Sequence, residues 1–341
     1  MKVVQANELE IAYERVGEGP PLVFVHGAAE DGRAWQPQLA ALADEFTVVA
    51  WDEPGAGRSS DVPADFGLAD YANCLAALIE ALALGPAHVA GLSWGGTVVQ
   101  ALYRHHPELV ATLILADTYA GWKGSLPEGE VRARIAGGRQ MLEAPAEEFG
   151  PTFPGLFADD PPAEAVLLHE EMAAAVRPES MRTALEVMAE ADLRDLLSSI
   201  AVPTLLIWGE LDARSPLSVA RQFEQAVPDT KLVVIPAPDT SATSSGRISS
   251  TTPCAGSAAP TRRSSPERPW VHLHAVIPGL SVSDRSSSAR KAEAEPNVCS
   301  GPFGHRRPQS NRQAPRPTPK ENPAVAGPSP MELAGIEPAT S

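Results

Sequence analysis

Short apolar runs alternate with amphipathic helical patterns along residues 1–236. Strands are expected at 9–16, 21–27, 46–52, 87–93, 109–117, 202–210 and 230–236. Helices are expected at 34–45, 68–84, 96–107 and 215–227. In the last of these helices, Ser215 is expected to be the N-cap and Pro216 the first helical residue. Continuous apolar strands separated by helices predict an α/β fold, with a mostly parallel sheet covered by helices on both faces.

Two segments depart from this alternation. Residues 119–197 have helical periodicity, as in Met181 and Leu185, and contain no convincing strand, so we expect a helical insertion that covers the sheet as a lid. Residues 237–341 are rich in serine and proline and show little periodicity. Such a composition does not bury enough apolar surface to fold. We therefore expect one domain over 1–236 and a disordered tail over 237–341.

Composition and charge narrow the class of protein. The chain has 341 residues, of which 43% are hydrophobic, and a formal net charge of −16, which argues against a nucleic-acid partner. The N-terminus lacks the apolar core of a signal peptide, and no run approaches the roughly 18 apolar residues of a membrane span. Cys74 is the single cysteine before residue 237, so disulfides are not expected to shape the fold. We expect a cytoplasmic protein with no membrane partner, and the sequence leaves its oligomeric state open.

One short motif carries the main chemical signal. Gly91, Ser93 and Gly95 form a G-x-S-x-G pattern between a predicted strand and a predicted helix. This is the setting of a nucleophile elbow, a sharp turn that needs small neighbours and exposes the serine hydroxyl at the carboxyl edge of the sheet. A serine hydroxyl is a poor nucleophile until a base takes its proton. The alternative interpretation is a glycine-rich strand–helix turn with an incidental serine.

A candidate acid follows a later strand. Asp212, in WGELDARSP, lies after a buried strand and before a helix. A carboxylate there can hold an imidazole in the right tautomer and stabilise its charged form. The chain order, serine before acid, also fits. Glu210 and Asp117 are weaker alternatives for the acid. The alternative interpretation of Asp212 is a loop carboxylate in water with no catalytic role.

These segments resemble the α/β-hydrolase family, in its lactonase, esterase and haloperoxidase-like branch. The resemblance covers about residues 1–236, including WDEPGAGRSS at 51–60, similar to the family's D-x-P-G-x-G-x-S turn, and HHPELV at 105–110. It implies that the backbone N–H groups of Ala28, in FVHGAAEDGRAW, and of Trp94 form an oxyanion hole. It also implies a small, fairly hydrophobic ester or lactone substrate and no metal or organic cofactor. A serine nucleophile argues against branches that use aspartate, such as haloalkane dehalogenases and epoxide hydrolases.

The histidine of such a triad is missing from its expected place. The family places it just after the last core strand, where this chain has KLVVIP followed by APDTSATSSG. The eight histidines lie elsewhere, at His26, His88, His105, His106, His169, His272, His274 and His305. His169 falls in the helical insertion, and we expect it on the surface.

A shifted reading frame accounts for both the absent histidine and the abrupt change in composition. Codons permitted for residues 239 onward, read two bases later, give a histidine, then N-L-E-x-P-x-x-F, then an amphipathic helix. We hypothesise that a frame shift near Pro236 to Pro238 replaced the native C-terminus. The alternatives are a genuine extension on a divergent protein, a non-catalytic ligand-binding protein, and an inactive product of a damaged gene. For an active protein, carbon–carbon bond hydrolysis and perhydrolysis are further alternatives to ester hydrolysis.

Overall fold

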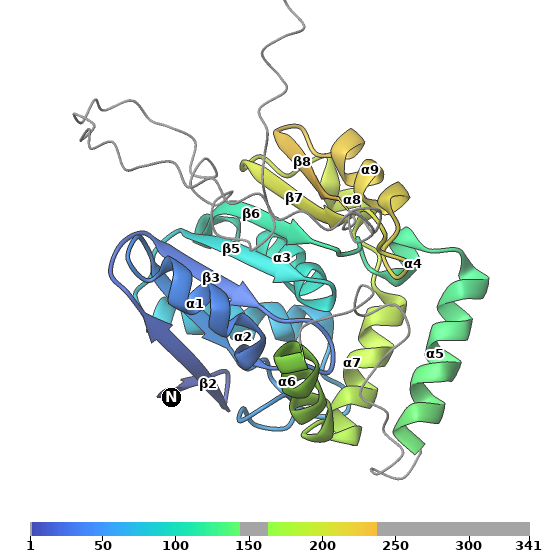
Figure 1. Ribbon diagram of the computed structural model, residues 1–341, viewed down its shortest axis with the longest axis horizontal. Coiled ribbons are helices and arrows are strands. Elements are labelled where there is room, and N and C mark those ends of the chain that lie inside the picture. The colour runs from blue at the N-terminus through green and yellow to red at the C-terminus, as the bar shows by residue number, and fades with distance from the viewer. Residues whose placement is uncertain (1, 144–162, 237–341) are drawn as a thin grey trace, which may run out of the picture. The chain divides into compact units, whose positions relative to one another are not determined.

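Eight strands form one sheet in the part of the chain that the computed structural model describes, residues 2–143 and 163–236 (Figure 1). The strands are β1 Lys2–Ala6, β2 Leu9–Val16, β3 Pro21–Val25, β4 Thr47–Trp51, β5 Ala87–Leu92, β6 Val110–Ala116, β7 Thr204–Gly209 and β8 Thr230–Ile235. Their order in the sheet is β1-β2-β4-β3-β5-β6-β7-β8. The pairs β1–β2 and β2–β4 are antiparallel and all others are parallel. The expected mostly parallel sheet is confirmed, and β1 is a strand that the sequence analysis missed. The tail predicted over 237–341 lies outside the described residues.

The register of the parallel strands brings their carboxyl ends to one edge. Val25 at the end of β3 pairs with Gly91 of β5, and Leu92 at the end of β5 pairs with Ala116 at the end of β6. The last register pair between β6 and β7 is Ala116 with Ile207. The loops that follow these four strands therefore open at the same edge, where ligands bind in open parallel sheets.

Helices cover both faces of the sheet, as expected from the sequence. Successive strand residues point to opposite faces. On one face, Leu22 and Phe24 pack with Leu39 and Leu42 of helix α1 (Gln36–Leu42), which follows a short 3-10 turn η1 (Gly32–Trp35). On the other face, Val23 packs in the larger cluster with residues of α2 (Leu68–Ala81), α3 (Trp94–His105) and α9 (Leu217–Ala226).

The described residues between β6 and β7 contain helices and no strand. These helices are α4 Trp122–Ser125, α5 Glu128–Glu143, α6 Ala163–Ala174, α7 Pro178–Glu190 and α8 Arg194–Leu197. Figure 1 shows α5, α6 and α7 beyond the carboxyl ends of the central strands. The helical content of the insertion agrees with its sequence periodicity, and its role as a lid stays a prediction.

The predicted cap of the last helix is wrong by one residue. Helix α9 begins at Leu217, and its N-cap is Pro216. Ser215 is fully buried, and its hydroxyl donates a 2.7 Å hydrogen bond to the carbonyl oxygen of Thr118. A tertiary contact with the loop after β6 therefore takes the side-chain oxygen that a cap would use.

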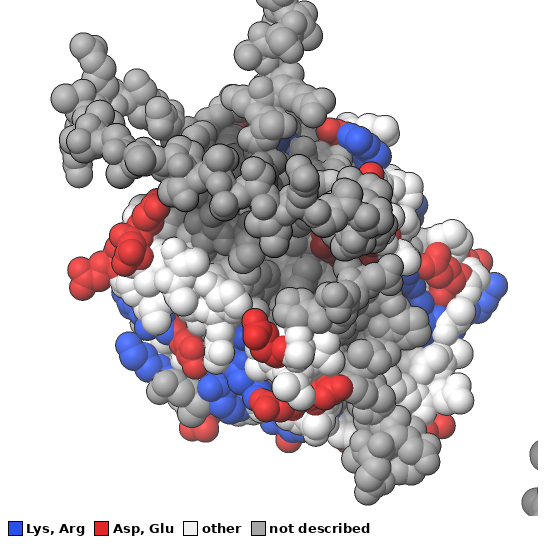
Figure 2. Space-filling view, viewed as in Figure 1, with Lys and Arg blue, Asp and Glu red and all other residues white. Residues whose placement is uncertain are grey.

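The surface carries charges of both signs. On the face drawn in Figure 2, acidic and basic side chains lie beside one another around uncharged areas. Several form ion pairs, such as Arg33 with Glu171 at 3.6 Å and Arg177 with Asp61 at 3.0 Å. No helix in residues 2–143 and 163–236 combines the length and the apolar character that crossing a membrane requires.

Candidate active site

Ser93 occupies a sharp turn between β5 and α3. Its backbone has φ 50° and ψ −114°, a region that residues other than glycine rarely adopt. The turn is held by two backbone hydrogen bonds, from Ser93 N to Ala116 O at 2.9 Å and from Gly96 N to Ser93 O at 3.1 Å. The hydroxyl of Thr118 also donates to Ser93 O, at 2.5 Å. The loop after β6 thus fixes the elbow that the sequence motif predicts.

The two glycines of the motif are required by close packing. A Cβ atom at Gly91 would lie 2.5 Å from the carbonyl oxygen of Gly95. A Cβ atom at Gly95 would lie 2.4 Å from the carbonyl oxygens of both Val25 and His26. No side chain fits at either place, because every contact is with backbone atoms. The same packing brings the elbow against the segment that follows β3.

The two proposed oxyanion donors lie on these touching segments. Trp94 is the first residue of α3, so its N–H has no acceptor within the helix. Neither the Trp94 N–H nor the Ala28 N–H donates a hydrogen bond to another residue in the described parts of the chain. Both amides are therefore available to a ligand oxygen at the edge of the sheet.

A buried histidine holds the segment after β3. The imidazole of His26 is fully buried, and its Nε2 is 3.0 Å from the backbone N of Glu53. Because that backbone N–H is a donor, Nε2 is the acceptor, and Nδ1 carries the proton that it donates to Gly27 O at 2.8 Å. Burial lowers the pKa of His26, which keeps the ring neutral. His26 is thus a structural residue of this loop.

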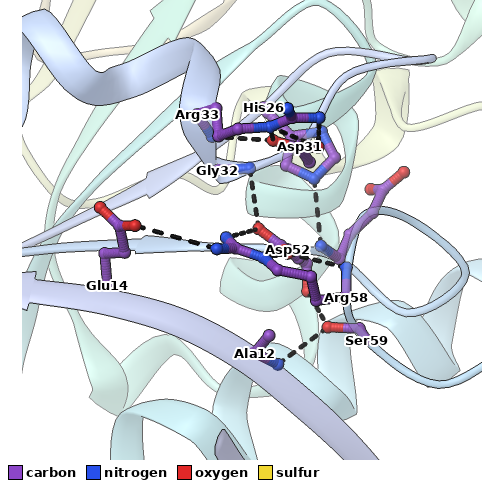
Figure 3. A network of polar contacts seen from close by, with 10 residues as sticks. Ala12, Glu14, His26, Asp31, Gly32, Arg33, Asp52, Arg58 and Ser59 are labelled. Atoms are coloured by element: carbon purple, nitrogen blue, oxygen red, sulfur yellow. Dashed lines mark hydrogen bonds and ion pairs between the residues drawn. The ribbon is translucent and has the colours of Figure 1, made fainter. Parts of the chain in front are cut away.

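The D-x-P-G-x-G-x-S turn is the centre of a polar network next to this loop (Figure 3). Buried Asp52 forms a two-point ion pair with Arg58, at 2.7 and 2.9 Å, and accepts from Gly32 N at 3.0 Å. The Ser59 hydroxyl donates to Asp52 O at 2.6 Å and accepts from Ala12 N at 2.9 Å. The motif therefore ties three segments of chain together and keeps the residues after β3 in place.

Asp212 follows β7 and has a defined geometry. One oxygen, Oδ1, accepts from Arg214 N at 2.7 Å and from Ser215 N at 2.9 Å. The carboxylate is also within hydrogen-bonding reach of the Asp117 carboxyl. Glu210, the alternative on the same loop, is exposed. The loops after β5 and β7 place Ser93 and Asp212 at the same edge of the sheet.

Asp117, the other alternative acid, lies beside Asp212. It follows β6 with φ 43°, and its Oδ1 accepts from Gly209 N at 2.9 Å. Burial, with a smaller contribution from the neighbouring Asp212 carboxylate within hydrogen-bonding reach, raises the pKa of Asp117 to about 7. The two carboxyl groups therefore lie within hydrogen-bonding reach of each other, and this contact favours the protonated form of Asp117.

Two buried glutamates near the oxyanion segment were missed by the sequence analysis. Glu53 is 5% exposed, and its Oε2 accepts from the indole Nε1 of Trp94 at 2.8 Å. Glu30 accepts from Gly27 N through Oε2 at 2.9 Å. Burial raises the pKa of Glu30 to about 7 and that of Glu53 well above its usual value. No spacing in the sequence distinguishes these carboxyls from solvated ones.

The expected surface position of His169 is wrong. His169 is 3% exposed, and its Nδ1 lies 3.9 Å from Glu30 Oε1. Helix α6 packs its inner side against η1, which turns this imidazole toward the segment after β3.

The described residues hold five histidines, and all of them precede β8: His26, His88, His105, His106 and His169. His88 lies near the amino end of β5, and its Nδ1 is 2.8 Å from the Thr112 hydroxyl. His105 ends α3, whereas Ser93 precedes its first turn. Both therefore lie toward the opposite edge of the sheet from Ser93. No group of three or more potential metal ligands occurs within the described residues.

Comparison with known proteins agrees with this architecture. A family model for the α/β-hydrolase fold matches residues 20–239. The chain belongs to the α/β-hydrolase family. Among its relatives is a pimeloyl-(acyl-carrier protein) methyl ester esterase of Chromobacterium violaceum, 31% identical over 233 residues that cover 67% of this chain and 90% of that protein. A second is an (E)-2-((N-methylformamido)methylene)succinate hydrolase of Acinetobacter baylyi, 29% identical over 67% of this chain and 87% of that protein.

Solved structures give the same result for this α/β hydrolase. An esterase of Thermogutta terrifontis is 31% identical, with a TM-score of 0.61 over 69% of this chain and 90% of that one. The expected family and fold are confirmed, and the relatives are hydrolases and esterases. The family match ends at Asp239, four residues after the end of β8.

Proposed function

We propose that this α/β hydrolase is a serine hydrolase of small carboxylic esters or lactones. The observation that carries the proposal is the strained backbone of Ser93, at φ 50° between β5 and α3, next to two free amides. Ser93 Oγ attacks the carbonyl carbon, and the N–H groups of Ala28 and Trp94 stabilise the resulting oxyanion. When the tetrahedral intermediate collapses, the C–O bond to the alcohol breaks, the alcohol leaves with the proton that came from Ser93, and the acyl group stays on Ser93. Water then attacks the acyl-enzyme, and the acid is released as Ser93 regains its proton. The carboxylate of Asp212 orients the histidine that moves the proton.

The histidine belongs, in this proposal, to a native C-terminus that a frame shift replaced. Two observations support this. The family match ends at Asp239, directly after the strand that the histidine follows in the family. None of the six residues of β8 is fully buried, whereas five of six in β7 are. An edge strand with partly exposed valines is a surface that a final helix would cover.

The sequenced chain is then a weak catalyst at best. A triad without its base loses on the order of 10⁴-fold in rate, because the serine keeps its proton. The alternative proposal, a ligand-binding protein on a hydrolase fold, is favoured by the same missing base and predicts ligand binding without turnover. In either case we place the protein in the cytoplasm, without nucleic-acid or membrane partners.

The test begins with the coding DNA across residues 225–265. We expect a single-base correction to place glycine and histidine after VVIP. The corrected chain should then hydrolyse p-nitrophenyl butyrate, and Ser93→Ala should abolish this activity. If sequencing confirms the reading frame and the 341-residue chain is inactive, the ligand-binding proposal is favoured. If Ser93→Ala in the corrected chain retains full activity, Ser93 is not the nucleophile.

A further inference from the structure

A narrow cavity lies between the sheet domain and the helical insertion. Its walls include Glu30, Glu53 and Tyr71 from the sheet domain, and Met172, Arg177 and Met181 from α6, α7 and the turn between them. Its volume is about 20 Å³, which holds about one water molecule. A larger ligand group therefore enters only when α6 and α7 move outward. The cavity therefore lies where the insertion meets Glu30, two residues after the proposed oxyanion donor Ala28.

One side chain of the cavity has unused hydrogen-bonding capacity. Arg177, the N-cap residue of α7, pairs through Nη1 with Asp61 at 3.0 Å. Its Nε and Nη2 have no contact with solvent and no hydrogen-bond partner among the described residues. These two atoms form the edge of the guanidinium that binds a carboxylate at two points, as Arg58 binds Asp52 in this same structure. Donors left unpaired in such a place are costly unless a ligand satisfies them.

The carboxyl groups of Glu30 and Glu53 in the cavity need not repel a bound anion. Burial holds the pKa of Glu53 well above its usual value and raises that of Glu30 to about 7. Protonated carboxyls donate hydrogen bonds instead of repelling a carboxylate. Apart from Ser180, whose hydroxyl donates to Asp61, the other side chains of the wall, such as Tyr71 and Met172, are largely apolar, and a low-polarity wall strengthens an ion pair.

A hydrogen bond also connects the cavity to a residue of the nucleophile elbow. The carboxyl of Glu53 is bonded to the indole of Trp94, whose backbone N–H is a proposed oxyanion donor. We propose that Arg177 binds a free carboxylate on the substrate, so that the preferred substrates are esters carrying a second, unesterified carboxyl group, such as half-esters of short dicarboxylic acids. The hydrolytic part of this inference rests on the proposed function, whereas the binding does not require Ser93 to react.

Binding of monomethyl glutarate and of its neutral analogue dimethyl glutarate tests the inference, by calorimetry on the full 341-residue chain at pH 6.5. We expect the half-ester to bind roughly tenfold or more tightly than the diester. Arg177→Gln should remove this preference, and Arg177→Lys should recover only part of it, because an ammonium lacks the planar two-point edge. Arg182→Gln is the matched control, since Arg182 lies on the same helix and is 35% exposed compared with 32% for Arg177.

A second variant separates recognition from a purely structural role. Asp61→Asn breaks the ion pair with Arg177 and leaves the guanidinium in place. Half-ester binding should survive in Asp61→Asn and in Ser93→Ala. Equal affinity for the two ligands, no binding of either, or equal losses in Asp61→Asn and Arg177→Gln would each overturn the inference. The corrected chain, with glycine and histidine after VVIP, is called the histidine-restored chain below. If half-esters bind but this chain never hydrolyses them, the proposed function fails while the carboxylate site stands.

Discussion

Replacing Glu30 with glutamine should change how the stability of the protein depends on pH. The Glu30 carboxyl is 13% exposed, and burial raises its pKa from 4.5 to about 7. A raised folded-state pKa gives a stabilising contribution that is complete below the unfolded pKa and is lost as pH rises through the folded one. The loss therefore runs between about pH 4.5 and pH 7. A shift of about 2.5 units corresponds to about 3 kcal/mol at pH 8.

The amide of glutamine removes the ionisation and keeps an oxygen that can accept from Gly27 N. Glu30→Gln should therefore match the parent protein at pH 5 and exceed it by up to about 3 kcal/mol at pH 8, measured by urea unfolding. Glu171→Gln is the control, because Glu171 is 70% exposed and its pair with Arg33 contributes little. An unchanged pH slope in Glu30→Gln would refute the reasoning that Glu30 ionises at a cost.

Three further predictions concern the site and its supports. Gly95→Ala should lower the free energy of unfolding by several kcal/mol, seen as a lower urea midpoint, because the added Cβ would lie 2.4 Å from two carbonyl oxygens. An unchanged midpoint would mean that the elbow relaxes freely. Asp52→Asn should cost roughly 1.5–3 kcal/mol by the same assay, because it removes the charge that Arg58, 35% exposed, binds at two points. In the histidine-restored chain, Asp212→Asn should reduce kcat on the order of 10⁴-fold, whereas the matched loop variant Glu210→Gln should stay within about twofold; the reverse ranking would reassign the acid.

The strands were predictable where burial is strong on both faces. All five residues of β4 are buried, so the run stands out as apolar. Strand β1 was missed because it lies at the antiparallel edge of the sheet and three of its five residues are exposed. The elbow at Ser93 was predictable because the turn requires glycine on both sides, and that requirement is written in the sequence.

Features that depend on tertiary packing were not predictable in the same way. Glu30 and Glu53 face a cavity whose opposite wall comes from α6, α7 and the turn between them, which are distant in the sequence. His169, on α6, is buried because this helix packs against η1, more than a hundred residues earlier in the chain. Asp117 and Asp212 come together because β6 and β7 are neighbours in the sheet, although the two residues are 95 positions apart in the chain.

Labelling with a serine-reactive fluorophosphonate, followed by mass spectrometry of the modified peptide, tests the central claim most directly. The claim is that Ser93 is a nucleophile whose base is absent from the 341-residue chain. We predict rapid labelling at Ser93 in the histidine-restored chain. In the chain as sequenced, the labelling rate should be lower by a factor on the order of 10³ or more. Equal labelling rates in the two chains, or a label on a residue other than Ser93, would contradict the account.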